Sequence, residues 1–278
     1  MDGADRSRAW DSALSVDEFA AVRSVGFDPV GQVFGAAVYY LATVLGVGCP
    51  GTTAASYERR DAAAVGSGEG AGGSAGRLEQ SLHAGRRTAL ARMAGECAEL
   101  GGHGVIGAAL RVTEIPATSL TAAAVEFTVI GTAVRVNGCA PLARPFATEL
   151  SGADFAKLVM GGWVPAGIAL GIAVAGLHDE LATTSSGPWG TGNAEVPAYT
   201  GLVSAARSGA RGRLERSARS LGADGVVVSA LTLRVSSDRC HAHAAATDHF
   251  AEAVIVGSAV ARIGGASGPP TGVAVLPL

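Results

Sequence analysis

The chain has 278 residues and a formal net charge of −3, with charged residues spread along both halves, so its composition offers no surface for nucleic acid. Lys157 is the only lysine, which argues against a Walker A phosphate loop and Schiff-base chemistry. The first residues lack the layout of a secretory signal, and the four dispersed cysteines include no CxxC pair, so we expect a cytoplasmic protein without a disulfide framework or a zinc ribbon.

The first predicted elements are a strand and a short helix. Residues Ala20–Phe34 are predicted to form a long strand. It is interrupted at Gly26 and Pro29, which are residues found where a strand bends or lies at a sheet edge. The residues that follow, Gly35–Leu45, are predicted to form a short helix.

A flexible segment, a long helix and two strands complete the first half. Glycine, serine and alanine dominate residues 46–76, which is typical of a flexible linker. Leu78–Leu100 then carries one apolar stripe, which predicts an amphipathic helix ending at Gly101. Strands are predicted at Gly104–Val112 and Val125–Val136, and we expect them to pair as an antiparallel hairpin.

The second half repeats the first. It predicts a helix at Tyr199–Leu221 and a hairpin of strands at Gly225–Val235 and Ala251–Ile263. Six apolar or glycine positions recur 136 residues later: Leu14, Phe19, Gly26, Pro29, Gly31 and Gly35 return as Leu150, Phe155, Gly162, Pro165, Gly167 and Gly171. Later segments recur after 121 residues (Leu100–Ile106 as Leu221–Val227) and after 126 residues (Glu126–Val134 as Glu252–Val260).

The repeat predicts two homologous domains, each large enough to bury its own core. They are residues 14–138, with a Gly/Ser-rich insertion at about 46–76, and residues 146–265, between flexible termini at 1–13 and 266–278. Each is predicted as strand, helix, helix, strand, strand: an α+β layer with helices packed on a small, mainly antiparallel sheet. One helical layer leaves sheet edges and glycine-rich segments uncovered, so we expect a homo-oligomer that closes into a ring.

Several segments resemble the YbjQ-like proteins, which carry a heavy-metal-binding label. These are the glycine-rich segments Gly26–Val38 and Gly162–Val174, the run Leu221–Val227, and Val129–Val134 with its echo Ile255–Val260. The resemblance implies a small α+β domain, present once per half, that assembles into closed rings and has no assigned function. The first copy departs from the pattern at His103, where the second keeps Asp224, so any chemical role of this acid would be missing from the first domain.

Metal-ligating side chains gather in one segment, at Cys240, His241, His243, Asp248 and His249. In an extended chain His241 and His243 point to the same side, and Asp248 or His249 can return across a turn. Such a set suits a divalent transition metal, namely zinc, nickel or copper. The alternative is an ordinary exposed hairpin loop, because residues 113–124 of the first half contain neither histidine nor cysteine.

One segment also has the length of a membrane span. Leu158–Leu177 carries no charge, and about 20 apolar residues suffice to cross a bilayer. Its glycines and its proline weaken both hydrophobicity and helicity. The counterpart Val22–Leu41 carries Arg23, Asp28 and Gln32, so we favour a buried strand and helix.

Catalytic motifs are missing from the sequence. Asp224 precedes Gly225, where an aspartate commonly hydrogen-bonds a turn, and Glu126 and Glu252 take equivalent strand positions without a second carboxylate. We therefore predict a non-enzymatic, cytoplasmic, ring-forming binding or scaffold protein, which leaves room for a protein partner. The alternatives are a metal-binding protein that uses the Cys240–His249 loop and a membrane-associated assembly that uses Leu158–Leu177.

Overall fold

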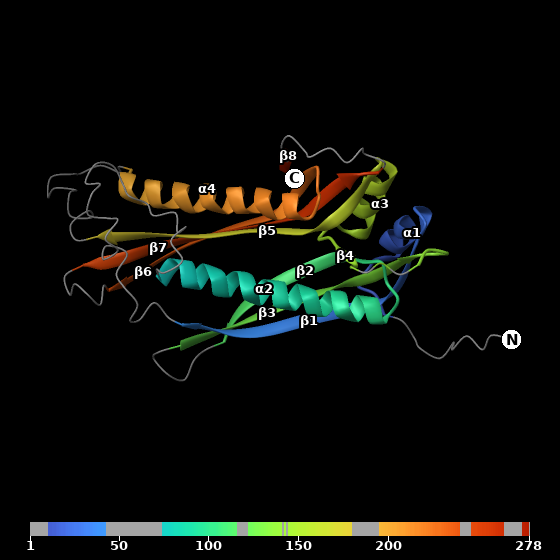
Figure 1. The fold of residues 1–278 in the computed structure, drawn as a ribbon, viewed down its shortest axis with the longest axis horizontal. Coiled ribbons are helices and arrows are strands. Elements are labelled where there is room, and N and C mark those ends of the chain that lie inside the picture. Colours follow the sequence, from blue (N-terminus) through green and yellow to red (C-terminus); the bar gives the residue numbers. More distant parts are fainter. Residues whose placement is uncertain are drawn as a thin grey trace.

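The computed structural model describes residues 11–42, 74–115, 122–140, 142, 144–179, 195–239, 246–263 and 274–277. The fold is α+β, and each half has the order helix, strand, helix, strand, strand, strand (Figure 1). The first half comprises α1 (Val16–Ser24), β1 (Phe27–Ala42), α2 (Ser74–Glu99), β2 (Gly104–Ile115), β3 (Ala122–Val136) and β4 (Phe146–Ala147). The second comprises α3 (Gly152–Met160), β5 (Trp163–Asp179), α4 (Pro197–Ser220), β6 (Gly225–Arg239), β7 (Thr247–Arg262) and β8 (Ala274–Pro277).

The two sheets share one topology and one register. Their strand orders are β1-β3-β2-β4 and β5-β7-β6-β8, antiparallel except for the last strand of each, which pairs in parallel. Val33 lies opposite Gly131 in the first sheet, and Ala169 lies opposite Gly257 in the second, as the sequence offsets require. The predicted antiparallel pairing of β2 with β3 and of β6 with β7 is confirmed.

The predicted strand at Ala20–Phe34 is confirmed only from Phe27 onward, because residues 20–24 belong to α1, and the predicted helix at Gly35–Leu45 is wrong over residues 35–42, which continue β1. Ser15 caps α1: its side chain accepts a hydrogen bond from the backbone N–H of Glu18, whose carboxylate accepts from the Ser15 N–H. Gly26, with a φ of +86°, then turns the chain into β1. The predicted order of strand, helix, helix, strand, strand in each half is therefore wrong.

Gly35 shows why the chain continues as a strand. A Cβ atom at this position would overlap the carbonyl oxygen of Ala89, because the backbone of α2 lies directly on β1. Gly171 on β5 meets the carbonyl oxygen of Ala210 on α4 in the same way. The repeated glycines are thus the points where each sheet touches its helix.

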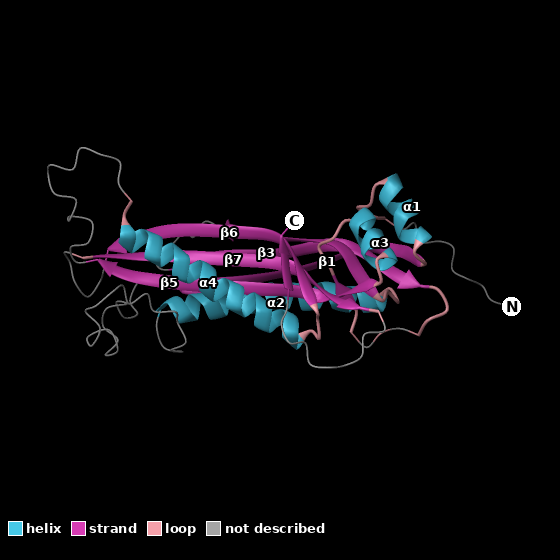
Figure 2. Cartoon of the chain, turned by 90° about the horizontal axis from the view of Figure 1, so that it is seen from above, coloured by secondary structure: helices cyan, strands magenta, loops and turns pink. Residues whose placement is uncertain are grey.

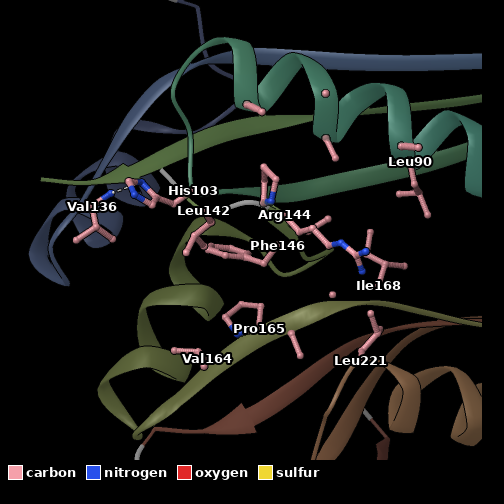
Figure 3. A pocket seen from close by; sticks show the side chains of 18 of the residues that line it. Leu90, His103, Val136, Leu142, Arg144, Phe146, Val164, Pro165, Ile168 and Leu221 are labelled. Atoms are coloured by element: carbon pink, nitrogen blue, oxygen red, sulfur yellow. Dashed lines mark hydrogen bonds between the residues drawn. The ribbon is translucent and has the colours of Figure 1, made fainter. Parts of the chain in front are cut away.

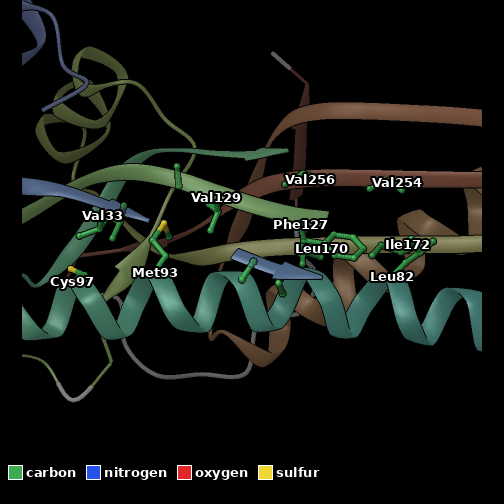
Figure 4. Close-up of a cluster of buried hydrophobic side chains, with 14 of the residues drawn as sticks. Val33, Leu82, Met93, Cys97, Phe127, Val129, Leu170, Ile172, Val254 and Val256 are labelled. Atoms are coloured by element: carbon green, nitrogen blue, oxygen red, sulfur yellow. The ribbon is translucent and has the colours of Figure 1, made fainter. Parts of the chain in front are cut away.

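The helices and sheets alternate as layers, and the core is continuous between the halves. Helix α4 covers β5 and β7, while α2 covers β1 and β3 and also contacts β5 (Figure 1). The largest apolar cluster joins Met93 of α2 and Phe127 of β3 to residues of the second sheet (Figure 4). Those residues are Leu170, Ile172, Val254 and Val256. The second half also buries apolar clusters of its own between α4 and its sheet, so the cores of the two halves are joined by a shared cluster.

A second junction lies at one end of the molecule, where α1 and α3 are side by side (Figure 2). Phe155 of α3 is fully buried, with its ring centroid 5.0 Å from that of Phe27 and 6.0 Å from that of Phe146. Nearby, the Thr148 hydroxyl donates a buried 2.7 Å hydrogen bond to the Ser258 hydroxyl. The first helix of the second half is thus held by the first half.

Some predicted boundaries differ from the structure. Helix α2 begins at Ser74, inside the predicted 46–76 insertion, and residues 43–73 lie outside the described residues. Strand β8 lies inside the C-terminal segment that was expected to be flexible. The apolar segment Leu158–Leu177 forms the end of α3 and most of β5, and none of the helices that the structure describes is long and apolar enough to cross a membrane.

Candidate functional site

A cavity of about 900 Å³ lies between the two halves (Figure 3). One wall is the small-residue side of α2, including Ala91 and Ala94, and the opposite wall is the start of β5 with Pro165 and Ile168. The chain that leaves β3 closes one end. Gly95 and the alanines of α2 leave this space open because they fill so little of the gap between helix and strand.

The cavity is predominantly apolar, and its polar lining residues include His103 and Arg144, whose side chain lies between α2 and β5 (Figure 3). His103 uses both ring nitrogens: Nε2 lies 2.8 Å from the carbonyl oxygen of Ala140, and Nδ1 accepts a 3.2 Å hydrogen bond from the backbone N–H of Val136. One donor and one acceptor are the pattern of a neutral imidazole. None of the lining residues that the structure describes carries a carboxylate. This lining suits an apolar ligand better than acid–base chemistry.

His103 and Asp224 perform the same structural task in the two halves. The Asp224 carboxylate accepts a 3.0 Å hydrogen bond from the backbone N–H of Arg262, the residue equivalent to Val136. The backbone N–H groups of His103 and Asp224 likewise donate to the equivalent carbonyl oxygens of Val134 and Val260. Both side chains therefore tie a turn to the central strand, which supports the predicted turn role of Asp224.

Of the five predicted metal ligands the structure describes only Asp248 and His249, and it does not place these two together. Cys240, His241 and His243 lie outside the described residues. Asp248 and His249 are neighbours on β7, so their side chains point to opposite faces of the sheet. Asp248 Oδ1 lies 2.6 Å from Nδ1 of His178. His249 Nδ1 lies 2.7 Å from the Ser237 hydroxyl, and its ring packs edge-on against Tyr199 of α4. Asp248 and His249 therefore cannot ligate the same ion.

The pairing of His178 with Asp248 was missed because the sequence does not show which residue of β7 lies opposite His178. The β5–β7 register places the two residues opposite each other at the far end of the second sheet, where the chain enters and leaves residues 240–245. Among the residues that the structure describes, no group of three or more His, Cys, Asp or Glu side chains is placed to hold a metal. Only the strand register reveals the pairing of His178 with Asp248, and the composition of the sequence does not give that register.

A charged cluster of Arg86, Arg234 and Glu252 lies between the halves. Of these residues only Glu252 was singled out from the sequence. Glu252 stands on the face of β7 that points away from α4. Burial raises the pKa of Glu252, and the positive charges of Arg86 and Arg234 oppose that rise. Arg86 of α2 is 5% exposed and lies over the ring of Phe127. Glu252 is therefore a contact between halves.

Comparisons with known proteins found one family model and one relative that match this chain. Residues 39–137 match the YbjQ_1 family, described as "Putative heavy-metal-binding". The chain is also 27% identical over 230 residues to the encapsulin nanocompartment protein Rv1762c of Mycobacterium tuberculosis, covering 79% of this chain and 76% of that protein. No solved structure gives a significant match. The resemblance is thereby confirmed over residues 39–137, which match the YbjQ-like family, and the second half of the chain repeats the fold of the first.

Proposed function

We propose that this chain is a non-enzymatic subunit of a homo-oligomeric ring that serves as a binding or scaffold protein. The similarity to an encapsulin nanocompartment protein supports a role in assembly. The site geometry supports a role without catalysis, because His103 and Asp224 are both engaged in holding turns. The apolar cavity beside His103 is the candidate binding site for a ligand.

The observation that carries the proposal is a set of large apolar side chains left exposed on strands. Phe34 and Val38 of β1 are 50% and 56% exposed, and Leu231, Leu233 and Val235 of β6 are 40–51% exposed. Each set has one facing direction, because alternate residues of a strand share a face. Exposed apolar surface of this kind marks interaction sites in soluble proteins.

The first prediction concerns the mass of the particle in solution. We expect size-exclusion chromatography with light scattering, at micromolar concentration and without detergent, to return a multiple of the 27.5 kDa chain mass. The apolar strand faces provide the driving force, since burying them stabilises the assembly by roughly 25 cal/mol per Å² of apolar area. A particle of 27.5 kDa would overturn the proposed assembly.

A second candidate function is metal binding near the His178–Asp248 pair. The two side chains are largely buried at 2.6 Å, next to residues 240–245, which carry Cys240, His241 and His243. Histidine–carboxylate pairs commonly orient and tune metal ligands. We propose that a zinc, nickel or copper ion bound in this loop would use His241 and His243 beside the pair.

The second prediction tests this loop by calorimetry. Titration with zinc or nickel is expected to show saturable binding by the unmodified protein and none by the His241→Ala/His243→Ala variant, because two ligands are lost. The control is His83→Ala, which removes a histidine of α2 and should leave binding unchanged. Absence of binding by the unmodified protein at micromolar metal would eliminate this candidate and leave the scaffold proposal intact.

A further inference from the structure

The two sheets have the same fold, but within the part of the chain that the structure describes only the second sheet is covered on its outer face. The outer face is the side turned away from the sheet's own helix, α2 for the first sheet and α4 for the second. On the second sheet Leu170 and Val174 are 3% and 2% exposed. Their equivalents on the first sheet, 136 residues earlier, are Phe34 and Val38, which are 50% and 56% exposed.

The first half provides the cover of the second sheet. Leu170 and Ile172 belong to the apolar cluster that contains Phe127 and the buried side of α2, and Leu110 of β2 packs against this cluster. Helix α2 and the neighbouring strand β2 thus form a ledge on which the outer face of the second sheet rests. The contact is heterologous, since it joins the helix side of one half to the outer face of the other.

The second half has the same ledge, and nothing in the described residues rests on it. The equivalent contacts of Ala89 with Gly35 and of Ala210 with Gly171 show that α2 and α4 lie on their sheets in the same rotational phase. Leu231 of β6 is therefore the structural equivalent of Leu110 of β2. Leu231 is 50% exposed, whereas Leu110 is partly buried in the cluster. We name the exposed surface of α4 and β6, with Arg207, Leu231 and Leu233, the α4 ledge.

The charged residues at the contact between the halves also have equivalents on the two open surfaces. Within the chain Arg86 of α2 is buried and its charge acts on Glu252 of the second sheet. The equivalent of Arg86 on α4 is Arg207, which is exposed, and the equivalent of Glu252 on the first sheet is Glu126. The open ledge and the open sheet face thus carry the same pair of opposite charges as the closed contact.

Two apolar residues at the contact between the halves have polar equivalents on the open surfaces. Leu90 of α2 and Ile168 of β5 both pack against the shared cluster. Their equivalents are Arg211 on α4 and Gln32 on β1. Both positions have changed from apolar to polar together, which keeps the two open surfaces compatible with each other.

We propose that the outer face of the first sheet binds the α4 ledge of a second copy of this chain, repeating between chains the contact that joins the halves within one chain. The proposal rests on the proposed function of self-assembly and names the surfaces that carry it. Each chain offers one outer face and one ledge, so the contact is head-to-tail and propagates until the rotation closes a ring. Arg207 of one copy then faces Glu126 of the next.

The test uses two full-length variants, each with one surface disabled. Phe34→Asp/Val38→Asp removes the outer face, and Leu231→Asp/Leu233→Asp removes the ledge. Each variant alone is expected to run as a monomer in light scattering. Their equimolar mixture is expected to give a one-to-one dimer of twice the chain mass, because one intact face meets one intact ledge and growth then stops. Val16→Asp/Met160→Asp is the control, since both residues are exposed (85% and 68%) outside these surfaces.

Every outcome decides the proposal. Variants that assemble like the unmodified protein, or monomeric variants whose mixture stays monomeric, would overturn the head-to-tail contact while leaving self-assembly itself standing. An unmodified protein that is a monomer would overturn self-assembly and this contact together. Circular dichroism of each variant shows whether the fold is retained.

A charge exchange provides a test with smaller changes at the same contact. Arg207→Glu and Glu126→Arg are each expected to weaken assembly, raising the concentration at half-dissociation at least tenfold, because each places like charges together. The double variant Arg207→Glu/Glu126→Arg should restore assembly, since the pair is opposite again. Equal assembly of all three variants, or no recovery in the double variant, would contradict the pairing of Arg207 with Glu126.

Discussion

Replacing Gly171 by alanine is expected to lower the free energy of unfolding by about 3 kcal/mol, and Gly35→Ala should act alike. The new Cβ of residue 171 would overlap the carbonyl oxygen of Ala210 and come within 2.9 Å of the backbone nitrogen of Leu214. Both atoms are backbone, so no side chain can turn away to make room. The whole of α4 would have to lift from β5, which opens the packing along the helix.

Urea unfolding at one fixed protein concentration, followed by far-UV circular dichroism, measures this effect. The matched control is Gly212→Ala on α4, where the nearest atom to a new Cβ is the tip of Arg216 at 3.7 Å. Alanine there should raise stability by up to about 1 kcal/mol, because it is the better helix former. A Gly171→Ala variant as stable as the unmodified chain would show that α4 does not lie on β5 as described.

Elements with strong periodicity were predicted well from the sequence. The apolar stripe placed a helix at Leu78–Leu100, and α2 spans Ser74–Glu99. The strand predicted at Val125–Val136 is β3 at Ala122–Val136. In these segments the local pattern and the tertiary packing favour the same structure, so the pattern alone is sufficient.

The secondary structure at the start of each half could not be predicted from apolar periodicity. Gly35-Ala36-Ala37 gives no clear period, and small residues suit a helix or a strand that is touched closely by another backbone. Only the position of α2 decides between these possibilities. The helix at Val16–Ser24 did carry a readable signal, the Ser15 and Glu18 capping box, which the prediction did not use.

The candidate site depended on register and on contacts between halves, which a single sequence does not contain. The segment Cys240–His249 gathers ligand-type residues, yet strand alternation separates Asp248 from His249 and the register brings in His178. The repeat likewise predicts two homologous domains without showing how they contact each other. Apolar periodicity shows which residues are buried, but it does not show that Leu170 is buried by the other half of the chain.

The shared core leads to the last prediction, that Phe155→Ala destabilises the whole chain and not the second half alone. Phe155 belongs to the second half by sequence, but its neighbours Val22, Ile106 and Val134 belong to the first. Truncating a fully buried phenylalanine costs about 3–5 kcal/mol, because transfer energy is lost and a cavity remains. In a chain of this length we expect the melting temperature to fall by about 10 °C.

Calorimetry should show a single unfolding transition before and after the substitution, since the same cluster holds both sheets and neither can unfold without exposing apolar surface of the other. Met160→Ala provides the control on the same helix: Met160 is 68% exposed, and its truncation should change stability by no more than about 0.5 kcal/mol. Two separate transitions, of which only one moves in Phe155→Ala, would contradict the continuous core. A single transition that moves as a whole would mean that duplication has produced one folding unit from two copies, and that the covered outer face of the second sheet is part of its stability.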